Sequence, residues 1–588
     1  MKTKWTVHKA QHIKTDDRFL IHAQAAIIDN PEAGTVIMFS TDWEGRMGFA
    51  ERAFTELRNA LESSGYDGEF PEYDKENNQF IIPDKWRMHF GGDSIDHGQF
   101  DIRIQRALKV CSSLIGNRDA NKPRILLECS DPKVIISNAI LNNVGSWGAD
   151  NNNRKNKDKC LLKAMLVMLN ESNSANSAIL QEILAKYNFS EDSFLAEHVR
   201  PAQLTADGKA ITPPYSAEYI NARQEIAQLL AGVPKQDLQV AALKWTLDCT
   251  MGCAPAKIAG KEAWQSAWDS RKKELDFLER QQGRILPEPQ LVELTIKSYI
   301  DPDCEYNLAI KYLQESFIAK RTGNILEIHG GLMPDSFKIP GTDLDIDSFD
   351  HIDEWIEAVN YYYQQSLDKL LNGQELSAND VAAMSYAIRF SLDKGTANLQ
   401  FLREEYANQI LSYNRAALAL PTHEKAKYKA YIAEIDKLKA MLKNLDKILA
   451  QDKKGSTICN NQSPVDGNNL ISGKDAKGID ILYKEVGFRF DPRVVALLER
   501  SGIDTVQVGH APTGDSGAAG LAFDSKIKVF SCDPTYAEDQ AGASVATFSI
   551  FDANGHANTI LISKASSDAP LICSAIDSDG VRRVIDRV

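Results

Sequence analysis

Residues 86–98 read WRMHFGGDSIDHG, a β-type run followed by two glycines, two aspartates and a histidine. Such a run is typical of a strand, and Gly91-Gly92 predicts a tight turn where the strand ends. Carboxylate and imidazole groups are ligands that divalent metals accept. The stretch therefore predicts a metal-binding loop at the carboxyl end of a strand.

Five other segments repeat this arrangement of a polar side chain beside a glycine or at the end of an expected element. A second β-type run, 324–328, ends in His329-Gly330-Gly331. The remaining segments are Phe39-Ser40-Thr41-Asp42-Trp43-Glu44-Gly45, Leu114-Ile115-Gly116-Asn117-Arg118-Asp119, Gly509-His510 and Ser531-Cys532-Asp533. In α/β proteins, ligands gather at the carboxyl ends of strands, so we expect these loops to converge.

The chain alternates expected strands and helices in two regions, which predicts an α/β fold. The first region has strands at 35–41 and 79–90 and helices at 48–63 and 100–114. The second has strands at 479–483, 505–508, 526–531, 546–551 and 559–563 and a helix at 493–501.

Two polar, helix-type regions interrupt this pattern and are interpreted as insertions. The core is expected at 1–127, 322–335 and 479–588; a helical insertion occupies 128–321, and a hairpin-like insertion with a linker occupies 336–478. Trp355 and Tyr361–Tyr363, early in the second insertion, are interpreted as helix packing. A substrate-recognition surface is the alternative interpretation.

The charge and composition of the chain limit which partners and which cell compartment are possible. The net charge of −14 over 588 residues argues against broad nucleic-acid binding, which needs a basic face. No stretch of about 18 apolar residues predicts a membrane span, and residues 1–9 lack the apolar core of a signal peptide. Nine irregularly spaced cysteines suit a reducing compartment. We expect synthesis in the cytoplasm, and export through a system that needs no N-terminal signal peptide stays open.

The ordered segments resemble the phosphoprotein phosphatase branch of the calcineurin-like metallophosphoesterases. That family's pattern runs Gly-Asp-x-His-Gly, Gly-Asp-x-x-Asp-Arg-Gly, Gly-Asn-His-Glu/Asp, His-Gly-Gly, then Gly-His or Ala-His. The resemblance covers about 25–127, 322–335 and 479–565. It implies a calcineurin-like metallophosphoesterase β-sandwich flanked by helices, here with two large helical insertions.

The resemblance also implies two divalent metal ions, between which a bridging hydroxide attacks a phosphate monoester. It places Asp42 on the first ion, Asp93 on both, and Asn117, His329 and His510 on the second. Glu44 stands where the family has a metal histidine, and its carboxylate favours Mn, with Mg, Fe or Zn as alternatives.

Two further departures from the family pattern are linked. His97 and Arg118 occupy positions where the family has arginine and histidine, respectively. We therefore expect Arg118 to clamp the phosphate and His97 to act as general acid, with Asp96 or Asp119 as its carboxylate partner. Lys484 stands roughly where the family has a second phosphate-binding arginine.

The expected activity is hydrolysis of phosphate monoesters on phosphorylated proteins, with protein partners held by the helical insertions. In this elaboration the chain resembles the Wip-type effector phosphatases that intracellular bacterial pathogens deliver into host cells. Two alternatives stay open. One is an esterase for a nucleotide or dinucleoside polyphosphate, and the other is a catalytically impaired scaffold of the same fold.

Overall fold

The structure is a computed structural model of the 588-residue chain, and it has a mixed α/β fold. It describes residues 27–63, 66–95, 100–120, 122–141, 156–172, 174–199, 203–204, 210–211, 215–250, 257–258, 261–262, 266–339, 342–372, 473–474, 480–481, 490–510, 518–521, 525–533, 544–564, 571–576 and 582–587, with isolated positions between 427 and 439.

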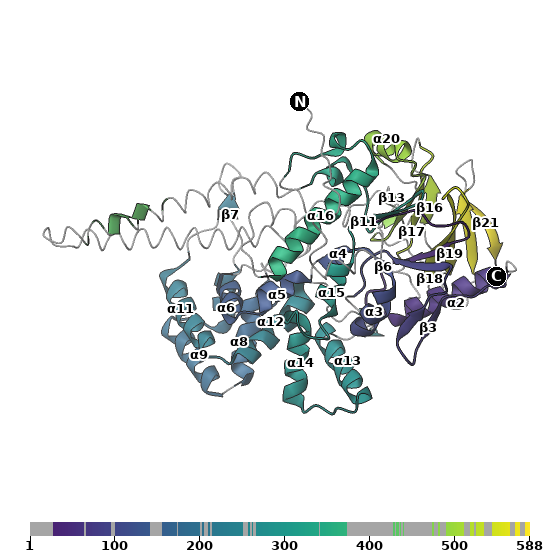
Figure 1. The fold of residues 1–588 in the computed structure, drawn as a ribbon. Coiled ribbons are helices and arrows are strands. Elements are labelled where there is room, and N and C mark those ends of the chain that lie inside the picture. Colours follow the sequence, from purple (N-terminus) through teal and green to yellow (C-terminus); the bar gives the residue numbers. More distant parts are fainter. Residues whose placement is uncertain are drawn as a thin grey trace.

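Two large sheets lie together on the right in Figure 1. In spatial order, one sheet contains β1 (Ile28–Asp29), β11 (Ala319–Thr322), β12 (Ile325–Ile328), β15 (Thr505–Val508), β17 (Lys528–Ser531) and β16 (Ala518–Leu521). The other contains β21 (Arg582–Arg587), β20 (Ile572–Ile576), β19 (Ala557–Lys564), β18 (Ser544–Phe551), β2 (Val36–Ser40), β5 (Trp86–Phe90) and β6 (Ser112–Ser113).

The two sheets pack face to face. Phe39 of β2, Phe530 of β17 and Val545 of β18 share one buried apolar cluster. Polar pairs also cross the interface: the His89 Nδ1 atom lies 2.7 Å from the Glu327 Oε1 atom, and the Gln507 amide donates to the Thr547 hydroxyl at 3.0 Å. Buried polar groups need such partners, so the sandwich interior is partly a hydrogen-bonded layer.

Helices cover both outer faces of the sandwich. The seven-stranded sheet packs against α2 (Met47–Ser63) and α3 (Asp101–Ala107), and the six-stranded sheet against α16 (Ile352–Leu371) and α20 (Pro492–Arg500). The sequence of α20 explains its orientation, since Val494, Leu497 and Leu498 recur at helical spacing and are all buried. The core therefore has four layers, helix, sheet, sheet and helix.

A helical block lies beside the sandwich (Figure 1) and has an apolar core of its own. Its helices are α5 (Pro123–Cys129), α6 (Pro132–Leu141), α8 (Leu161–Ser172), α9 (Ser174–Lys186), α10 (Glu191–His198), α11 (Ala217–Ala231), α12 (Lys235–Thr250), α13 (Ala267–Gln281) and α14 (Glu288–Ile300). Helix α15 (Leu308–Glu315) then leads back to β11. None of the helices described has both the length and the apolar character to cross a membrane.

The smaller elements are two-stranded ribbons and short helical turns. The ribbons pair β3 (Glu72–Asp74) with β4 (Gln79–Ile81), β7 (Gln203–Leu204) with β8 (Ala210–Ile211), β9 (Lys257–Ile258) with β10 (Lys261–Glu262), and β13 (Gly473–Lys474) with β14 (Asp480–Ile481). The short helical turns are η2 (Leu108–Val110), α4 (Asn117–Ala120), η3 (Pro334–Phe337) and η4 (Ile346–Ser348).

Several sequence predictions of elements are confirmed, and one is wrong. The strand expected at 505–508 matches β15, and the helix expected at 48–63 matches α2 to within one residue. The helix expected over 100–114 ends at Ala107, because Ser112 and Ser113 pair with His89 and Phe90 as strand β6. Pairing with the sheet overrode the helical pattern of the sequence.

Parallel pairing explains where the polar loops lie. Strands β2, β5 and β6 run parallel in one sheet, so the loops after Ser40, Phe90 and Ser113 leave from the same edge. Strands β12, β15 and β17 run parallel in the other sheet. The loops that follow these six strands are the ones in which the sequence predicts metal ligands or related polar groups.

Candidate metal centre

Three loops of the seven-stranded sheet are bound to one another through their backbones. The Asp42 N–H donates to the Gly92 carbonyl at 2.9 Å, and the Glu44 N–H donates to the Asp93 carbonyl at 2.9 Å. The Asp93 side chain in turn accepts from the Arg118 N–H at 2.8 Å. The loops at 41–45, 91–95 and 116–119 are thus one hydrogen-bonded unit.

The six-stranded sheet contributes two histidines to this unit. The Gly509 N–H donates to the His329 carbonyl at 2.8 Å, which joins the loops after β12 and β15. The His510 N–H donates to the Asp42 carboxylate at 3.2 Å and so links the two sheets. Asp42 and His510, which are far apart in the sequence, therefore meet at one edge of the sandwich.

Four of the expected metal ligands have left-handed backbone conformations. The φ angles are 59° for Asp42, 47° for Glu44, 56° for Asp93 and 63° for His510. Among the described residues, only Asn78 and Asn188 are other non-glycine residues with positive φ. Such conformations are unfavourable for residues with a Cβ and concentrate at functional sites, so the strain indicates that these loops form a functional site.

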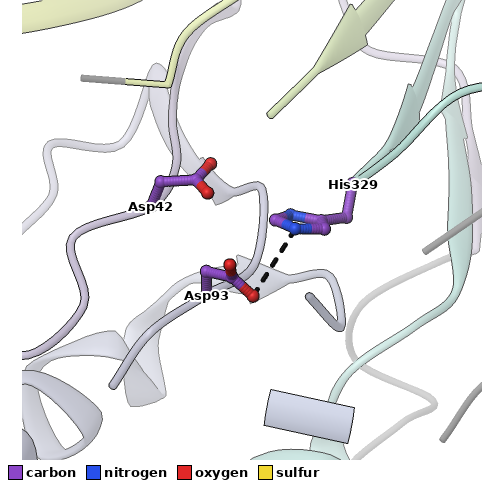
Figure 2. A group of neighbouring side chains, drawn as sticks. All are labelled: Asp42, Asp93 and His329. Atoms are coloured by element: carbon purple, nitrogen blue, oxygen red, sulfur yellow. Dashed lines mark ion pairs between the residues drawn. The ribbon is translucent and has the colours of Figure 1, made fainter. Parts of the chain in front are cut away.

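Asp42, Asp93 and His329 form a buried cluster that could hold a metal ion (Figure 2). Each offers a ligand atom, and these atoms all lie within 4.8 Å of one another. The His329 Nε2 atom lies 3.5 Å from the Asp93 Oδ1 atom, the pair joined by the dashed line in Figure 2. Two carboxylates and an imidazole are a common ligand set for divalent metals.

The hydrogen bonding around His329 favours a cation at this cluster. Its Nδ1 atom lies 2.7 Å from the Gly91 carbonyl oxygen, which can only accept, so Nδ1 carries the proton. In neutral His329 the Nε2 atom then presents a lone pair, yet it lies 3.1 Å from the Asn117 Oδ1 atom, which is also an acceptor. A metal ion bound by both atoms would satisfy these two acceptors.

Asn117 also joins His510 to the cluster. The same Asn117 Oδ1 atom lies 2.9 Å from the His510 Nδ1 atom, and the rings of His329 and His510 have centroids 5.4 Å apart. The sequence predicted these three residues as ligands of one ion. The structure brings them together at hydrogen-bond distance.

The carboxylates of the site repel one another in the absence of a cation. Burial raises the pKa of Asp42 well above its ordinary value, and the negative charges of Asp533 and Asp93 raise it further. Burial and the Asp93 charge raise the pKa of Asp119 to about 6. A carboxyl group in such a setting either takes up a proton or keeps its charge beside a counter-charge, which a divalent ion would supply.

Two glycines leave space for these carboxylates. A Cβ atom at Gly116 would lie 2.1 Å from the Asp93 Oδ1 atom, and one at Gly509 would lie 2.3 Å from the Asp42 Oδ2 atom. Both contacts are shorter than any real side chain makes. Glycine is therefore required at these positions for the loops to approach so closely.

Glu44 lies between two arginines. Its Oε1 atom is 2.7 Å from the Arg118 Nε atom, and its Oε2 atom is 3.2 Å from an Arg46 terminal nitrogen. The Arg118 Nε atom is also 3.5 Å from the Asp93 Oδ2 atom. Both carboxylate oxygens of Glu44 thus have guanidinium partners, and Arg118 lies directly beside the metal cluster.

Asp119 braces the loops of the site. Its Oδ2 atom accepts from the backbone N–H groups of Asp93 and Gly116 at 2.7 and 3.0 Å. Its Oδ1 atom accepts from the Ser94 N–H and hydroxyl at 3.0 and 2.7 Å. This hydrogen bonding makes Asp119 a positioning residue. Asp96, His97 and Lys484 lie outside the described residues, so the partnership of Asp119 with His97 stays a prediction.

Three contributors to the site were missed or undervalued by the sequence interpretation. Thr41 donates from its hydroxyl to the Asp42 carboxylate at 2.6 Å, Arg46 contacts Glu44, and Asp533 is buried close enough to raise the pKa of Asp42. The sequence signal for Arg46 was its position two residues after Glu44 in the same loop. The signal for Asp533 was its place at the end of a predicted strand.

The residues present fit a divalent metal ion. The donor set contains two buried carboxylates, two imidazoles and an amide oxygen, and it includes acceptors that face one another. The positive φ angles and the glycine contacts hold these groups in place. Comparison of the chain with protein-family models, with curated proteins and with solved structures gives no match.

Proposed function

We propose that the protein is a metal-dependent phosphoprotein phosphatase with a calcineurin-like metallophosphoesterase fold. The observation that supports this most directly is the buried cluster of Asp42, Asp93 and His329 beside the Arg118 guanidinium. A cation site next to a buried guanidinium suits a dianionic phosphate ester. The order of the loop motifs along the chain supports the same family.

In this proposal, Asp42, Asp93, Asn117, His329 and His510 hold two divalent ions, with Mn preferred. When bound, such ions polarise a phosphoryl oxygen and make water a nucleophile at neutral pH. The same proposal includes a site that binds one ion through Asp42, Asp93 and His329.

The chain's own residues then bind and orient the substrate. The Arg118 guanidinium, held by Glu44 at 2.7 Å, binds phosphoryl oxygens, and Arg46 on the other side of Glu44 is the second cation of the clamp. His97 donates a proton to the leaving oxygen. Lys484, the second phosphate-binding residue expected from the sequence, stays a prediction beside Arg46.

A phosphorylated protein is the proposed substrate because the helical block beside the sandwich is large enough to recognise one. Its helices from α5 to α14 have a core of their own, so their outer surfaces can vary without loss of the site. This arrangement suits contacts with a macromolecule made at a distance from the bond that is cleaved.

Substitution of Asp93 by Asn tests the proposal. Asp93→Asn should lower bound metal and reduce hydrolysis of para-nitrophenyl phosphate by about a thousandfold, because several kcal/mol of transition-state stabilisation depend on the ions. Metal content by mass spectrometry, turnover and the unfolding midpoint should be measured together. Asp67→Asn, at an exposed position, is the control and should leave all three unchanged.

Two results would overturn the proposal. One is near wild-type turnover by folded Asp93→Asn, and the other is undiminished turnover by the wild-type protein after complete removal of metal. A wild-type protein that binds metal through Asp93 but hydrolyses no phosphoprotein or aryl phosphate would support the scaffold alternative instead.

A further inference from the structure

A polar cavity lies at the edge of the sandwich, and none of the candidate metal ligands lines it. We call it the sandwich-edge pocket. It has a volume of about 570 Å³, and its walls come from β5, β6, β11, the η2 turn and α15. This volume is within the range of about 300–1,000 Å³ that is usual for small-molecule sites.

The floor of the sandwich-edge pocket is a chain of buried hydrogen-bonding groups. Glu327 accepts from His89 Nδ1 at 2.7 Å, the His89 Nε2 atom accepts from the Lys320 ammonium at 3.3 Å, and Lys320 donates to the Ser112 hydroxyl at 2.7 Å. Glu327 lies behind His89 and is not part of the pocket wall. Lys320 is buried in the protein, and its side chain lines the pocket, where it can contact a ligand.

The floor has more donors than acceptors. Among the described residues, Lys320 uses two of its three ammonium N–H groups, both described above. The side-chain oxygens of Ser113 and Ser316 are buried, and neither makes a hydrogen bond of normal geometry with the described residues. Lys320, Ser113 and Ser316 are each at least nine-tenths buried and line the pocket.

The pocket wall has a net positive charge, as does Lys320 on the floor. The lining includes the cations Arg87, Lys109, Lys311 and Lys320 and the carboxylates Asp29 and Glu315. Arg87 is paired with Asp29, and Glu315 lies near Lys109 and Lys311. When Glu327 is counted as well, the pocket still has a net charge of one positive unit. A buried donor without an acceptor is costly, so both the charge and the donors favour an anionic ligand.

We propose that the sandwich-edge pocket binds a small organic anion, whose phosphate or carboxylate head group accepts from Lys320, Ser113 and Ser316 while Lys109 and Lys311 contact it at the rim. This site does not depend on the proposed phosphatase activity. It is nevertheless placed to affect the metal centre, because His89 and Ser113 lie on β5 and β6, four residues before Asp93 and Asn117.

Calorimetric titration of metal-stripped protein tests the proposal, since removal of metal weakens phosphate binding at the metal centre and Arg118→Ala controls for the guanidinium that stays there. The probes are ribose 5-phosphate and citrate, which separate a phosphate head group from carboxylates. Saturable binding of either probe is expected. Lys320→Met and, separately, the rim variant Lys109→Ala/Lys311→Ala should weaken it by about ten- to a hundredfold, because each removes charge-assisted hydrogen bonds.

Lys235→Ala, an exposed lysine on α12, is the matched control and should bind as the wild type does. The rim variant alone decides the question if Lys320→Met does not fold. Absence of binding by both probes up to about 10 mM, or binding that survives every folded pocket variant, would overturn the proposal. Binding lost in the pocket variants but retained in Arg118→Ala would place the ligand in this pocket and not at the metal centre.

Discussion

At the scale of single residues, the structure gives Glu44 a different setting from the one its sequence position implied. The family that the chain resembles has a metal ligand at this position, but both carboxylate oxygens of Glu44 contact guanidinium groups of Arg118 and Arg46. Glu44 is almost wholly buried, and these ion pairs offset the hydration that its carboxylate loses. The geometry favours a role in orienting the two arginines.

Glu44→Gln separates the two roles. If Glu44 orients the arginines, the variant should keep its bound metal and show a KM for an aryl phosphate raised about tenfold, since the amide oxygen can accept from only one arginine and the amide NH2 cannot accept from the other. Metal stoichiometry and steady-state kinetics are the measurements, and Glu51→Gln on α2 is the control. Loss of one ion per chain from the folded Glu44→Gln protein would instead make Glu44 a ligand.

At the scale of elements, α16 shows how an expected insertion became part of the core. Trp355, Ile356 and Val359 are buried in the cluster that also contains Leu326 of β12 and Val506 of β15. Tyr363 is buried, whereas Tyr361 is 47% exposed. The packing interpretation of the aromatic cluster is therefore confirmed for Trp355 and Tyr363, and any shortening of the second insertion must spare α16.

Within the helical block, α10 contains a histidine that should make stability depend on pH. Burial lowers the pKa of His198 from 6.5 to about 3, and its Nδ1 atom lies 2.6 Å from the Tyr219 hydroxyl. The pKa is lower in the folded chain than in the unfolded one, so acid protonates the unfolded state first. The stabilisation is fully present above pH 6.5 and is lost as the pH falls toward 3.

His198→Gln removes this titration. Between pH 6.5 and 5, the wild-type protein should lose about 2 kcal/mol more unfolding free energy than the variant, because one proton contributes about 1.4 kcal/mol per pH unit. Urea unfolding of both proteins at the two pH values measures the difference. Parallel losses in the two proteins would show that His198 does not titrate during unfolding.

At the scale of the whole molecule, the helical block is attached to the metal loops through a helix cap. Glu274 of α13 accepts from the Ile102 and Arg103 N–H groups of α3 at 3.0 Å each, where α3 has no side-chain cap of its own. The residue before α3, Phe100, donates its N–H to the Gly45 carbonyl at 3.1 Å in the loop that contains Asp42 and Glu44. The insertion therefore helps to position the site.

Removal of this cap should affect both stability and activity. Glu274→Ala leaves two buried N–H groups without acceptors and should lower the unfolding free energy by about 2–4 kcal/mol. Turnover of a small aryl phosphate should fall about tenfold, because small displacements of catalytic loops are expensive. Glu288→Ala, at an exposed ion pair on α14, should change stability by less than about 0.5 kcal/mol.

Unchanged turnover in a folded but destabilised Glu274→Ala protein would show that the block is mechanically separate from the site. In that case the first insertion would act on substrate choice alone. Turnover should be measured well below the unfolding temperature of each variant, so that loss of folded protein is not counted as loss of chemistry.

The sequence by itself predicted those features that depend on neighbours in the chain. β2, β5 and β15 were expected from apolar runs, and glycine turns marked the loops with Asp42, Asp93, His329 and His510. Runs and turns have local causes, namely side-chain burial and allowed backbone angles. The α/β class and most of the candidate ligand set follow from them, whereas Asp96, His97 and Lys484 stay predictions.

Only the tertiary structure decided which distant groups meet. It placed the His510 Nδ1 atom 2.9 Å from Asn117, a residue 393 positions away, and Glu274 on an N-terminus 172 positions earlier. It also turned 112–113 from expected helix into strand, brought Arg46 to Glu44, and enclosed Lys320 in a pocket. These outcomes depend on strand order and on packing between layers, which sum contributions from the whole chain and leave no periodic signal in a local stretch of sequence.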